Sequence, residues 1–229
     1  MQAIVQHAYG TAEALLLEDV EQPTPGPHEV LVGVHAASIN HADLFLAAGR
    51  PYVMRVAVGL RRPRVAIRGR DLAGEVVTVG EAVTRFGPGD HVYAETTTGT
   101  FAEYACVPEH LLALKPANLN FEQAAAVPLA GVAALQGLRD VGGVQPGDAV
   151  LIDGASGGVG TFAVQIAKAL GAEVTGVCST RNADLVRSLG AEHVIDYTAA
   201  DFTARGRRYD LILQVAGTSS ARACRRPGG

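Results

Sequence analysis

A cluster of glycines between an apolar run and a helical run constrains this chain more than any other feature. Residues 153–160 read DGASGGVG, after the apolar run AVLI (149–152) and before TFAVQIAKAL (161–170). A glycine-rich turn between a strand and a helix lets the backbone approach a pyrophosphate, which the helix N-terminus attracts with free N–H groups and a positive dipole end. The pattern predicts a dinucleotide site, although its G-x-x-G-x-x-G spacing departs from the usual one and a plain strand-to-helix turn stays open.

The pattern around this turn predicts a parallel α/β unit. Single apolar strands alternate with stretches of helical period, which is the βαβαβ arrangement of a doubly wound sheet. The strands are expected at 149–154, 173–178, 193–196 and 209–217, and the helices at roughly 158–170 and 182–189, with a shorter one after Asp201.

The first part of the chain has a different character. Up to about Leu114, short β-branched runs are punctuated by Gly and Pro, which is typical of antiparallel, barrel-like β structure with long loops. These runs lie at 29–39, 72–80, 90–95 and 101–108. The segment LKPANLN (114–120) separates the two patterns, so we expect one domain over 1–120 and a second over 121–229.

Composition narrows the function classes. The 229 residues carry a net charge of -4, which favours neither nucleic acid nor an anionic membrane surface, so a small-molecule substrate is expected. The three cysteines are far apart and odd in number, which fits a reducing compartment rather than a disulfide framework. The first ten residues, MQAIVQHAYG, do not resemble a signal peptide, and we expect a cytoplasmic protein.

Several blocks resemble a known family when they are taken in order. GRDLAGEVVTVG, FGPGDHVY, FAEYACVPEHLLALKPANLNFEQAAAVPLAG and the long block from VLIDGASGGVG to AEHVIDY are similar to the zinc-free quinone oxidoreductase branch of the medium-chain dehydrogenase/reductase superfamily. The resemblance implies a GroES-like substrate and catalytic domain over 1–120 and a Rossmann NAD(P)-binding domain over 121–229. It further implies hydride transfer from NADPH to a quinone or an α,β-unsaturated carbonyl compound, by a homodimer when full-length.

Zinc ligands are missing from the positions where this resemblance places them. Zinc-dependent members use two Cys and a His-Glu pair for a catalytic metal, and four close Cys for a structural one. Here Asn40 stands at the first Cys position, Arg70 and Asp71 at the His-Glu pair, and PLAGVAAL (128–135) at the second Cys. A guanidinium would repel the ion, so no metal is expected. His41 and Asp43 are ligand types, but hydrogen bonding to backbone or to each other is favoured.

Without a metal, a reductase of this type must polarise its substrate carbonyl by hydrogen bonding. The resemblance places Asn40, Asp43 and Tyr52 around the nicotinamide, and these are the candidate catalytic residues. Each has a structural alternative, because Asn40 and Asp43 also suit a helix cap ahead of LFLAAG and Tyr52 can simply close the cleft.

The run GLRRPRVAIRGR holds five arginines between Leu60 and Asp71. It could form an anion patch, but we favour a solvated loop in which Arg70 forms a salt bridge beside Asp71.

The candidate cofactor residues lie after successive strands. They are Ser156, Gly157, Gly158, Val159 and Gly160 in the glycine turn; Ser179, Thr180 and Arg181 after the second strand; Tyr197 after the third; and Val215 after the fourth. NAD-specific folds carry an acid about 20 residues beyond the glycine turn, at the end of the second strand. Here no carboxylate follows that strand before Asp184, and Arg181 suits a 2′-phosphate, which predicts NADPH. Alternatively, Arg181 merely caps a surface turn.

Two departures from the family pattern affect the functional prediction. Only four parallel strands are expected where a full dinucleotide fold has six, which suggests a fragment or a truncated product with one uncovered sheet edge. LQVAGTSS also differs from relatives at the end of the last strand, so the contacts of residues 214–217 stay open. The alternative to an oxidoreductase is therefore a non-catalytic NADPH-binding sensor protein, or an inactive fragment of such an enzyme.

Overall fold

The chain divides into two compact units, Met1–Leu129 and Ala130–Gly229. The computed structural model describes residues 1–200 and 207–216, so the short helix expected after Asp201 lies outside the described residues. The division falls at 129 rather than at 120 because helix α3 (Phe121–Ala125) packs on three strands of the first unit. Each unit has its own core, and each is described by itself below.

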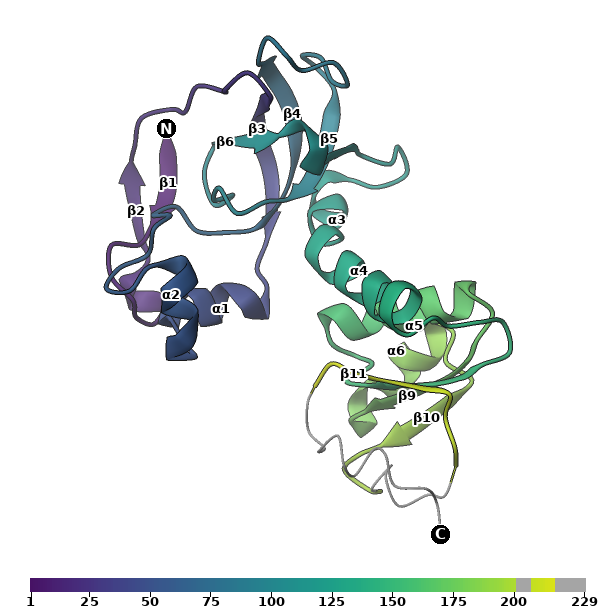
Figure 1. The fold of residues 1–229 in the computed structure, drawn as a ribbon. Helices are drawn as coiled ribbons and strands as arrows, with labels where there is room; N and C mark the ends of the chain where they lie inside the picture. The colour runs from purple at the N-terminus through teal and green to yellow at the C-terminus, as the bar shows by residue number, and fades with distance from the viewer. Residues whose placement is uncertain (201–206, 217–229) are drawn as a thin grey trace. The chain divides into compact units, whose positions relative to one another are not determined.

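The first unit is built on a five-stranded antiparallel sheet with strand order β6-β3-β4-β5-β7 (Figure 1). Four of these strands confirm the sequence-based runs. They are β3 (Glu29–Ser38), β4 (Asp71–Val79), β5 (His91–Glu95) and β6 (Tyr104–Pro108), to which β7 (Leu112–Leu114) is added. A separate antiparallel hairpin, β1 (Gln2–Val5) with β2 (Leu16–Asp19), was not predicted.

Alternating residues of these strands form the core of the first unit. Val30 and Val32 of β3 and Leu72 and Val76 of β4 are at most 1% exposed and pack with Val92 of β5. Each such side chain stabilises the unit by about 1.5–3 kcal/mol relative to an exposed position.

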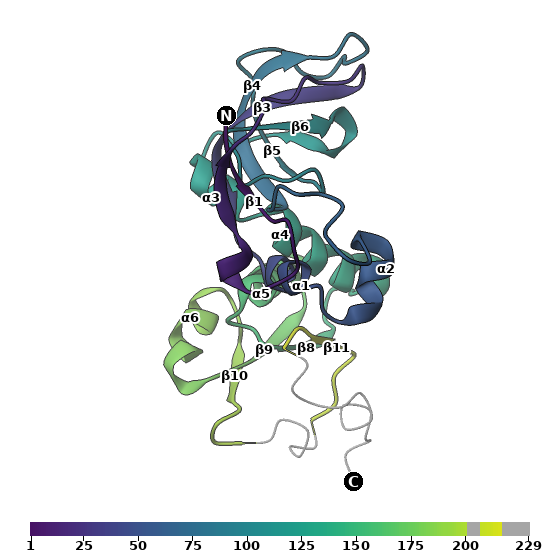
Figure 2. The same cartoon turned by 90° about the vertical axis from the view of Figure 1, so that its left-hand side faces the viewer.

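Short helices complete the first unit around its sheet. These are η1 (Ala12–Ala14), α1 (His41–Ala48), η2 (Tyr52–Met54), α2 (Arg55–Val58), η3 (Glu109–Leu111) and α3. Figure 2 shows α1 and α2 near each other at one end of the unit, joined to the sheet by β3 and the segment before β4. The polar start of β4 therefore lies near α1.

The second unit contains a parallel sheet with strand order β10-β9-β8-β11. Its elements are α4 (Pro128–Leu135, which begins in the first unit), the π-helical segment η4 (Gln136–Val141), β8 (Ala149–Asp153), α5 (Gly158–Ala169), β9 (Glu173–Cys178), η5 (Thr180–Asn182), α6 (Ala183–Ser188), β10 (His193–Asp196) and β11 (Leu211–Gln214). The four predicted strands and the two predicted helices that lie within the described residues, α5 and α6, are confirmed, with β9 and β10 at the expected bounds. This order matches the first four strands of a dinucleotide-binding sheet.

The two central strands of the second unit, β8 and β9, are buried on both faces, as is typical of parallel sheets, whereas the edge strands β10 and β11 are only partly buried. Val150 and Ile152 of β8 face a large cluster that includes Ala163 and Val164 of α5. Leu151 belongs to a different cluster on the opposite face. Because successive side chains of a strand alternate between faces, the continuous apolar run of β8 fills two cores.

Within the described ranges 1–200 and 207–216, no helix is long and apolar enough to cross a membrane.

Candidate functional site

The glycine turn of the second unit folds back over the end of β9. Gly154 has a φ of +86°, and the N–H groups of Gly154 and Ala155 donate to the Val177 carbonyl at 3.2 and 3.0 Å. A Cβ added to Gly160 would lie 2.0 Å from the carbonyl oxygen of Gly154. Only glycine at position 160 therefore lets the first turn of α5 pack this closely against the loop.

The N-terminus of α5 has an open surface. The N-cap is Gly157, which has no side chain with which to cap the helix. A Cβ added to Gly158 would meet nothing within 4 Å. The first N–H groups of a helix attract anions through their hydrogen bonds and through the helix dipole, so this backbone fits a pyrophosphate.

A side-chain hydrogen bond connects the glycine turn to the segment that follows β9. The Asn182 Nδ2 atom donates to Ser156 Oγ at 3.0 Å. Next to it, Ser179 is half-buried and Arg181 is exposed. Sequence reasoning treated Asn182 only as a helix cap, because no spacing rule reveals a contact between residues 26 positions apart.

An acid does lie at this edge of the sheet, at the end of β10 instead of β9. Thr180 Oγ1 donates to Asp196 Oδ2, while Thr198 donates to Asp196 Oδ1 from its backbone N (2.9 Å) and its hydroxyl (2.7 Å). The Thr180 hydroxyl and the Thr198 donors hold the pKa of Asp196 below its usual range. Asp196 and Cys178 are partners at the ends of the neighbouring strands β10 and β9. The Asp196 carboxyl group therefore lies beside the turn that follows β9.

The remaining predicted cofactor residues lie at the same edge. Tyr197 directly follows β10 and is 58% exposed, and the Val215 N–H donates to the Asp153 carbonyl at 3.0 Å. Gly217, whose contacts the sequence left open, is outside the described residues. The carboxyl ends of β8, β9, β10 and β11 thus carry the whole predicted set, which is where open α/β sheets bind ligands.

In the first unit, Asp71 is the centre of a buried polar network. It is fully buried and accepts hydrogen bonds from Ser38 Oγ (2.9 Å), Asn40 Nδ2 (2.8 Å) and the Leu129 backbone N (3.1 Å). Burial raises the pKa of Asp71 above its ordinary value, although the hydrogen bonds from Asn40, Ser38 and Leu129 oppose this rise. Because Leu129 lies in the first turn of α4, this contact places the Asp71 carboxyl group at the N-terminus of that helix, where the helix dipole favours a negative charge.

Asn40 and Asp43 form a helix cap at the start of α1, which is the structural alternative that the sequence left open. Asp43 Oδ2 accepts from the Asn40 backbone N at 2.7 Å at the start of α1, which is half of a capping box. The Asn40 amide also donates to Ser38 Oγ at 3.2 Å in addition to Asp71. Both bonds start from the same Nδ2 atom, and Ser38 Oγ in turn donates to Asp71 Oδ2, so the amide of Asn40 is part of the buried network.

Asp43 is 7% exposed, and burial raises its pKa, against the hydrogen bond from Asn40 and the charges of Arg70 and Arg68.

Tyr52 is the most exposed of the three candidate catalytic residues. Its side chain is 64% exposed, and the guanidinium groups of Arg50 and Arg55 lie 5.7 and 4.9 Å from its ring centroid. These contacts are all made on the first unit's surface.

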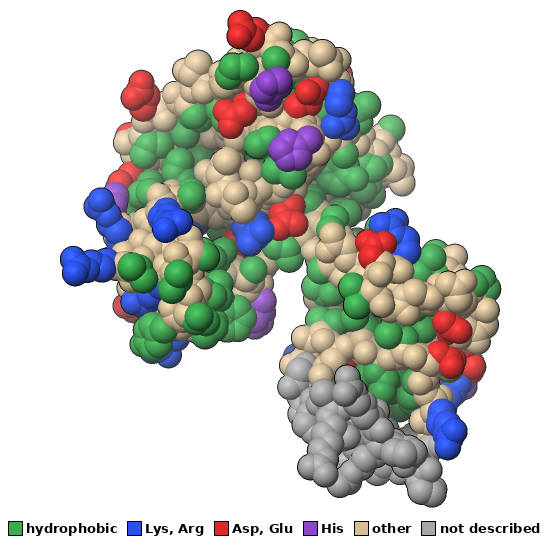
Figure 3. Space-filling model, in the orientation of Figure 1, with side chains coloured by type: hydrophobic (Ala, Val, Ile, Leu, Met, Phe, Trp, Pro, Cys, Tyr) green, Lys and Arg blue, Asp and Glu red, His purple; other side chains and the backbone are tan. Residues whose placement is uncertain are grey.

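The arginine-rich segment divides into an exposed and a partly buried half. Arg61, Arg62 and Arg64 are exposed, and Figure 3 shows Lys and Arg side chains gathered on the side of the unit that carries α2. The prediction that Arg70 pairs with Asp71 is wrong. Arg70 Nη2 binds Glu95 Oε1 at 2.6 Å, because neighbours on a strand point to opposite faces and Asp71 turns into the core.

The donors around these residues do not suit a zinc ion. Over residues 1–200 and 207–216, no three His, Cys, Asp or Glu side chains come together in a group that could hold a metal. Asn40 and Asp71 are already bonded to each other, and Arg70 brings a positive charge.

Both parts of the chain match known families. Residues 26–117 match the alcohol dehydrogenase GroES-like domain, and residues 158–229 match the family described as zinc-binding dehydrogenase. The chain is 37% identical to quinone-oxidoreductase QR1, chloroplastic, of Triphysaria versicolor, over 94% of this chain and 68% of the relative. It is 38% identical to NAD(P)H oxidoreductase RTN4IP1, mitochondrial, of Bos taurus, over 85% of this chain.

The fold is also shared with solved structures. The quinone oxidoreductase of Escherichia coli complexed with NADPH superposes with a TM-score of 0.79 at 30% identity, covering 90% of this chain and 61% of that chain. The chain spans 53% of the length of the mitochondrial relative and about two thirds (68%) of the chloroplast one. Because the blocks, the domain order and both folds agree, the chain belongs to the quinone oxidoreductase-like branch of the medium-chain dehydrogenase/reductase superfamily.

Proposed function

We propose that this protein is an NADPH-dependent oxidoreductase that transfers hydride to a quinone or an α,β-unsaturated carbonyl compound without zinc. The observation that carries the proposal is the bare glycine turn at the N-terminus of α5, with Gly160 packed on the Gly154 carbonyl and open space at Gly158. This is a surface for a pyrophosphate, on a unit whose strand order is that of a dinucleotide fold.

The residues around the turn fit the cofactor. The open space at Gly158 lets a phosphate approach the backbone, and the Asn182 to Ser156 bond holds the turn beside the segment that carries Arg181. We assign Ser179, Thr180 and Arg181 to the ribose and its 2′-phosphate. When bound, the nicotinamide supplies the hydride, and the protein binds, orients and shields the reactants.

The zinc-free part of the proposal rests on chemistry at three positions. Arg70 is paired with Glu95, and Asn40 and Asp71 are bonded to each other, which leaves no convergent ligand set there. Elemental analysis of protein purified without chelator tests this directly. We expect less than about a tenth of an equivalent of zinc, and near-stoichiometric zinc that survives dialysis would disprove the proposal.

The central experiment separates an enzyme from a binding protein. An oxidoreductase must oxidise NADPH, followed at the nicotinamide absorbance band, only when a quinone or enone from a small panel is added. A sensor or an inactive fragment shows cofactor-dependent thermal stabilisation alone. A chain that shows neither effect would contradict both functions.

The remaining assignments follow from the sequence. We propose a small-molecule substrate, a homodimer in the full-length protein and a cytoplasmic location. Fractionation of the source cells tests the location, because the relatives named above are chloroplastic and mitochondrial.

A further inference from the structure

The carboxyl group of Asp196 joins two turns of the second unit, the one after β9 and the one after β10. Its Oδ2 atom accepts a hydrogen bond from the Thr180 hydroxyl, and its Oδ1 atom accepts from the backbone N and the hydroxyl of Thr198. Both turns carry candidate cofactor residues, Arg181 in the first and Tyr197 in the second. One side chain therefore connects the two segments that we assign to the same end of the cofactor.

The direction of these hydrogen bonds decides what the Thr180 hydroxyl can do. The Thr180 hydroxyl and the Thr198 donors hold the pKa of Asp196 below its usual range, so this carboxyl group is ionised at neutral pH. An ionised carboxyl group only accepts hydrogen bonds, so the single hydroxyl hydrogen of Thr180 is used by Asp196. No hydrogen of this hydroxyl is left for a phosphate oxygen, and the hydroxyl instead holds its own turn against the end of β10.

Arg181 lies between two residues that are tied to different parts of the sheet. Thr180, before it, is bonded to Asp196 at the end of β10. Asn182, after it, donates to Ser156 Oγ in the glycine turn at 3.0 Å. The backbone of Arg181 is thus held on both sides while its side chain is exposed. A turn that is fixed before binding loses less conformational entropy when its side chain engages an anion.

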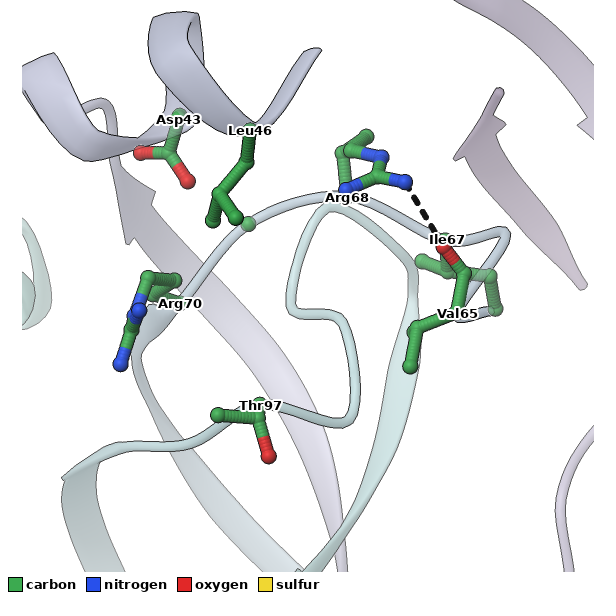
Figure 4. A pocket seen from close by; sticks show the side chains of 8 residues that line it. Asp43, Leu46, Val65, Ile67, Arg68, Arg70 and Thr97 are labelled. Carbon is green, nitrogen blue, oxygen red and sulfur yellow. Dashed lines mark hydrogen bonds between the residues drawn. The ribbon is translucent and has the colours of Figure 1, made fainter. Parts of the chain in front are cut away.

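The Arg181 guanidinium group differs from those of the two arginines that line a small cavity in the first unit. There, Arg68 Nη2 donates to the Val65 carbonyl at 2.8 Å, as the dashed line in Figure 4 shows, and Arg70 Nη2 binds Glu95. Over the described part of the chain, the Arg181 side chain makes neither a hydrogen bond nor an ion pair. Its charge is therefore available for an anion from outside the chain, and the 2′-phosphate of NADPH is such an anion.

We propose that Asp196 is a positioning residue of the cofactor site, which sets the preference for NADPH over NADH by holding the turn that carries Arg181. The proposal deepens the proposed function and rests on it for the identity of the cofactor. Asp196 acts through Thr180 rather than by touching the 2′-phosphate, because two negative groups in contact repel each other. An acid at the end of β9 would favour NADH by binding the ribose 2′-OH, whereas this acid at the end of β10 supports NADPH.

The test is a titration of the full chain with NADPH and with NADH, which differ only in the 2′-phosphate. Isothermal titration calorimetry gives both dissociation constants without any substrate. We expect Asp196→Ala to bind NADPH about fivefold more weakly than the wild type, because the turn with Arg181 must then be ordered on binding. NADH binding should stay within about twofold of the wild type, which also shows that the variant is folded.

Variants of Thr180 show whether Asp196 acts through this hydroxyl. Thr180→Val removes the hydroxyl and should weaken NADPH binding while sparing NADH binding, and Thr180→Ser, which keeps it, should retain more NADPH affinity than Thr180→Val. The double variant Asp196→Ala/Thr180→Val should bind NADPH no more weakly than Asp196→Ala alone. Losses that multiply in the double variant would overturn the proposal, because the two residues would then act independently.

A matched control separates position from charge. Asp184→Ala also removes one negative charge, from the neighbouring helix α6, where the Asp184 side chain is fully exposed and pairs with Arg187. This variant should leave both dissociation constants unchanged. The proposal fails if Asp196→Ala binds NADPH more tightly than the wild type, which would mean that the carboxyl group repels the cofactor. It also fails if Asp196→Ala loses NADPH and NADH affinity equally, which would mean a structural role alone.

Failure of the proposed function is distinguishable from failure of this inference. A preference for NADPH that Asp196→Ala loses, in a chain that never oxidises NADPH, would retain the role of Asp196 and reject the enzyme. Conversely, quinone-dependent or enone-dependent NADPH oxidation with an unchanged cofactor preference in Asp196→Ala would retain the enzyme and reject the role of Asp196. A wild type that binds neither cofactor would reject both.

Discussion

The two units build their candidate sites in opposite ways. In the second unit, the site is made of backbone in one short stretch, where Gly160 has no space for a Cβ and Gly158 has ample space. In the first unit, the candidate residues are joined by side chains from segments far apart in the chain, such as Asn40 and Asp71. The contrast teaches that a site made of backbone is sensitive to residue size only where the chain packs closely, as at Gly160, whereas one made of side chains depends on hydrogen-bond partners.

The acidic side chains of the two units also differ, in the direction in which folding shifts their pKa values. Burial raises the pKa values of Asp43 and Asp71 in the first unit. In the second unit, hydrogen bonds from Thr180 and Thr198 lower the pKa of Asp196, which is close to solvent. Folding therefore works against ionisation of Asp43 and Asp71 and favours ionisation of Asp196.

The strongest test of this difference between the two sites is a pair of glycine variants in the first turn of α5. We expect Gly160→Ala to destabilise the second unit by about 3 kcal/mol, because its Cβ would overlap the Gly154 carbonyl. The matched Gly158→Ala should be neutral or slightly stabilising, since alanine is the better helix former and nothing lies within 4 Å. Urea denaturation measures both, and equal stabilities would show that the turn is not closely packed.

For the first unit, the corresponding variant removes the buried hydrogen-bond acceptor Asp71. We expect Asp71→Ala to cost about 2–3 kcal/mol, because buried donors of Ser38, Asn40 and Leu129 lose their acceptor. Asp19→Ala, an exposed acid on β2, is the control and should change stability by less than about 0.5 kcal/mol. A similar loss in both variants, measured by urea denaturation, would contradict a role for the buried network.

A cofactor titration sharpens the description of the second unit's site. Arg181→Ala should weaken NADPH binding by about 1.5–3 kcal/mol and leave NADH nearly unchanged, the range expected for a charged hydrogen bond to a 2′-phosphate. Arg187→Ala, on the exposed surface of α6, should affect neither cofactor. Equal affinities of the wild type for NADPH and NADH, or an equal loss for both in Arg181→Ala, would remove Arg181 from the site.

The smallest expected effects are opposite pH dependences in the two units. The raised pKa of Asp71 means that its contribution to stability is present below the ordinary value of 3.8 and declines as the pH rises through the folded-state value. The lowered pKa of Asp196 means that its contribution is present above 3.8 and is lost as the pH falls through the folded-state value.

Urea denaturation at a series of pH values tests these signs. From pH 3 upward, the stability of the wild type relative to Asp71→Asn should fall, and relative to Asp196→Asn it should rise. Slopes of the same sign for both variants would show that the two acids do not differ in this way.

Much of the second unit was predictable, because its signals are local. The bounds of β9 and β10, the position of α5 and the anion-binding turn follow from apolar runs and glycines within about 50 residues. The pairing of Arg70 with Glu95 and the bond from Asn182 to Ser156 were not predicted, since each joins residues about 25 positions apart. Strand β7 was not predicted because its three residues are too few for a periodic pattern.

By itself, the sequence determined the family, the two folds and the backbone-built turn, because residue type and period act over short distances along the chain. Only the tertiary structure decided which side-chain hydrogen-bond donors find which acceptors. It turned Asp71 into the core, bonded the amide of Asn40 to Ser38 and Asp71, and paired Arg70 with Glu95. The physical reason is that a hydrogen bond depends on the position of a partner from a distant segment, and that position exists only once both segments have packed.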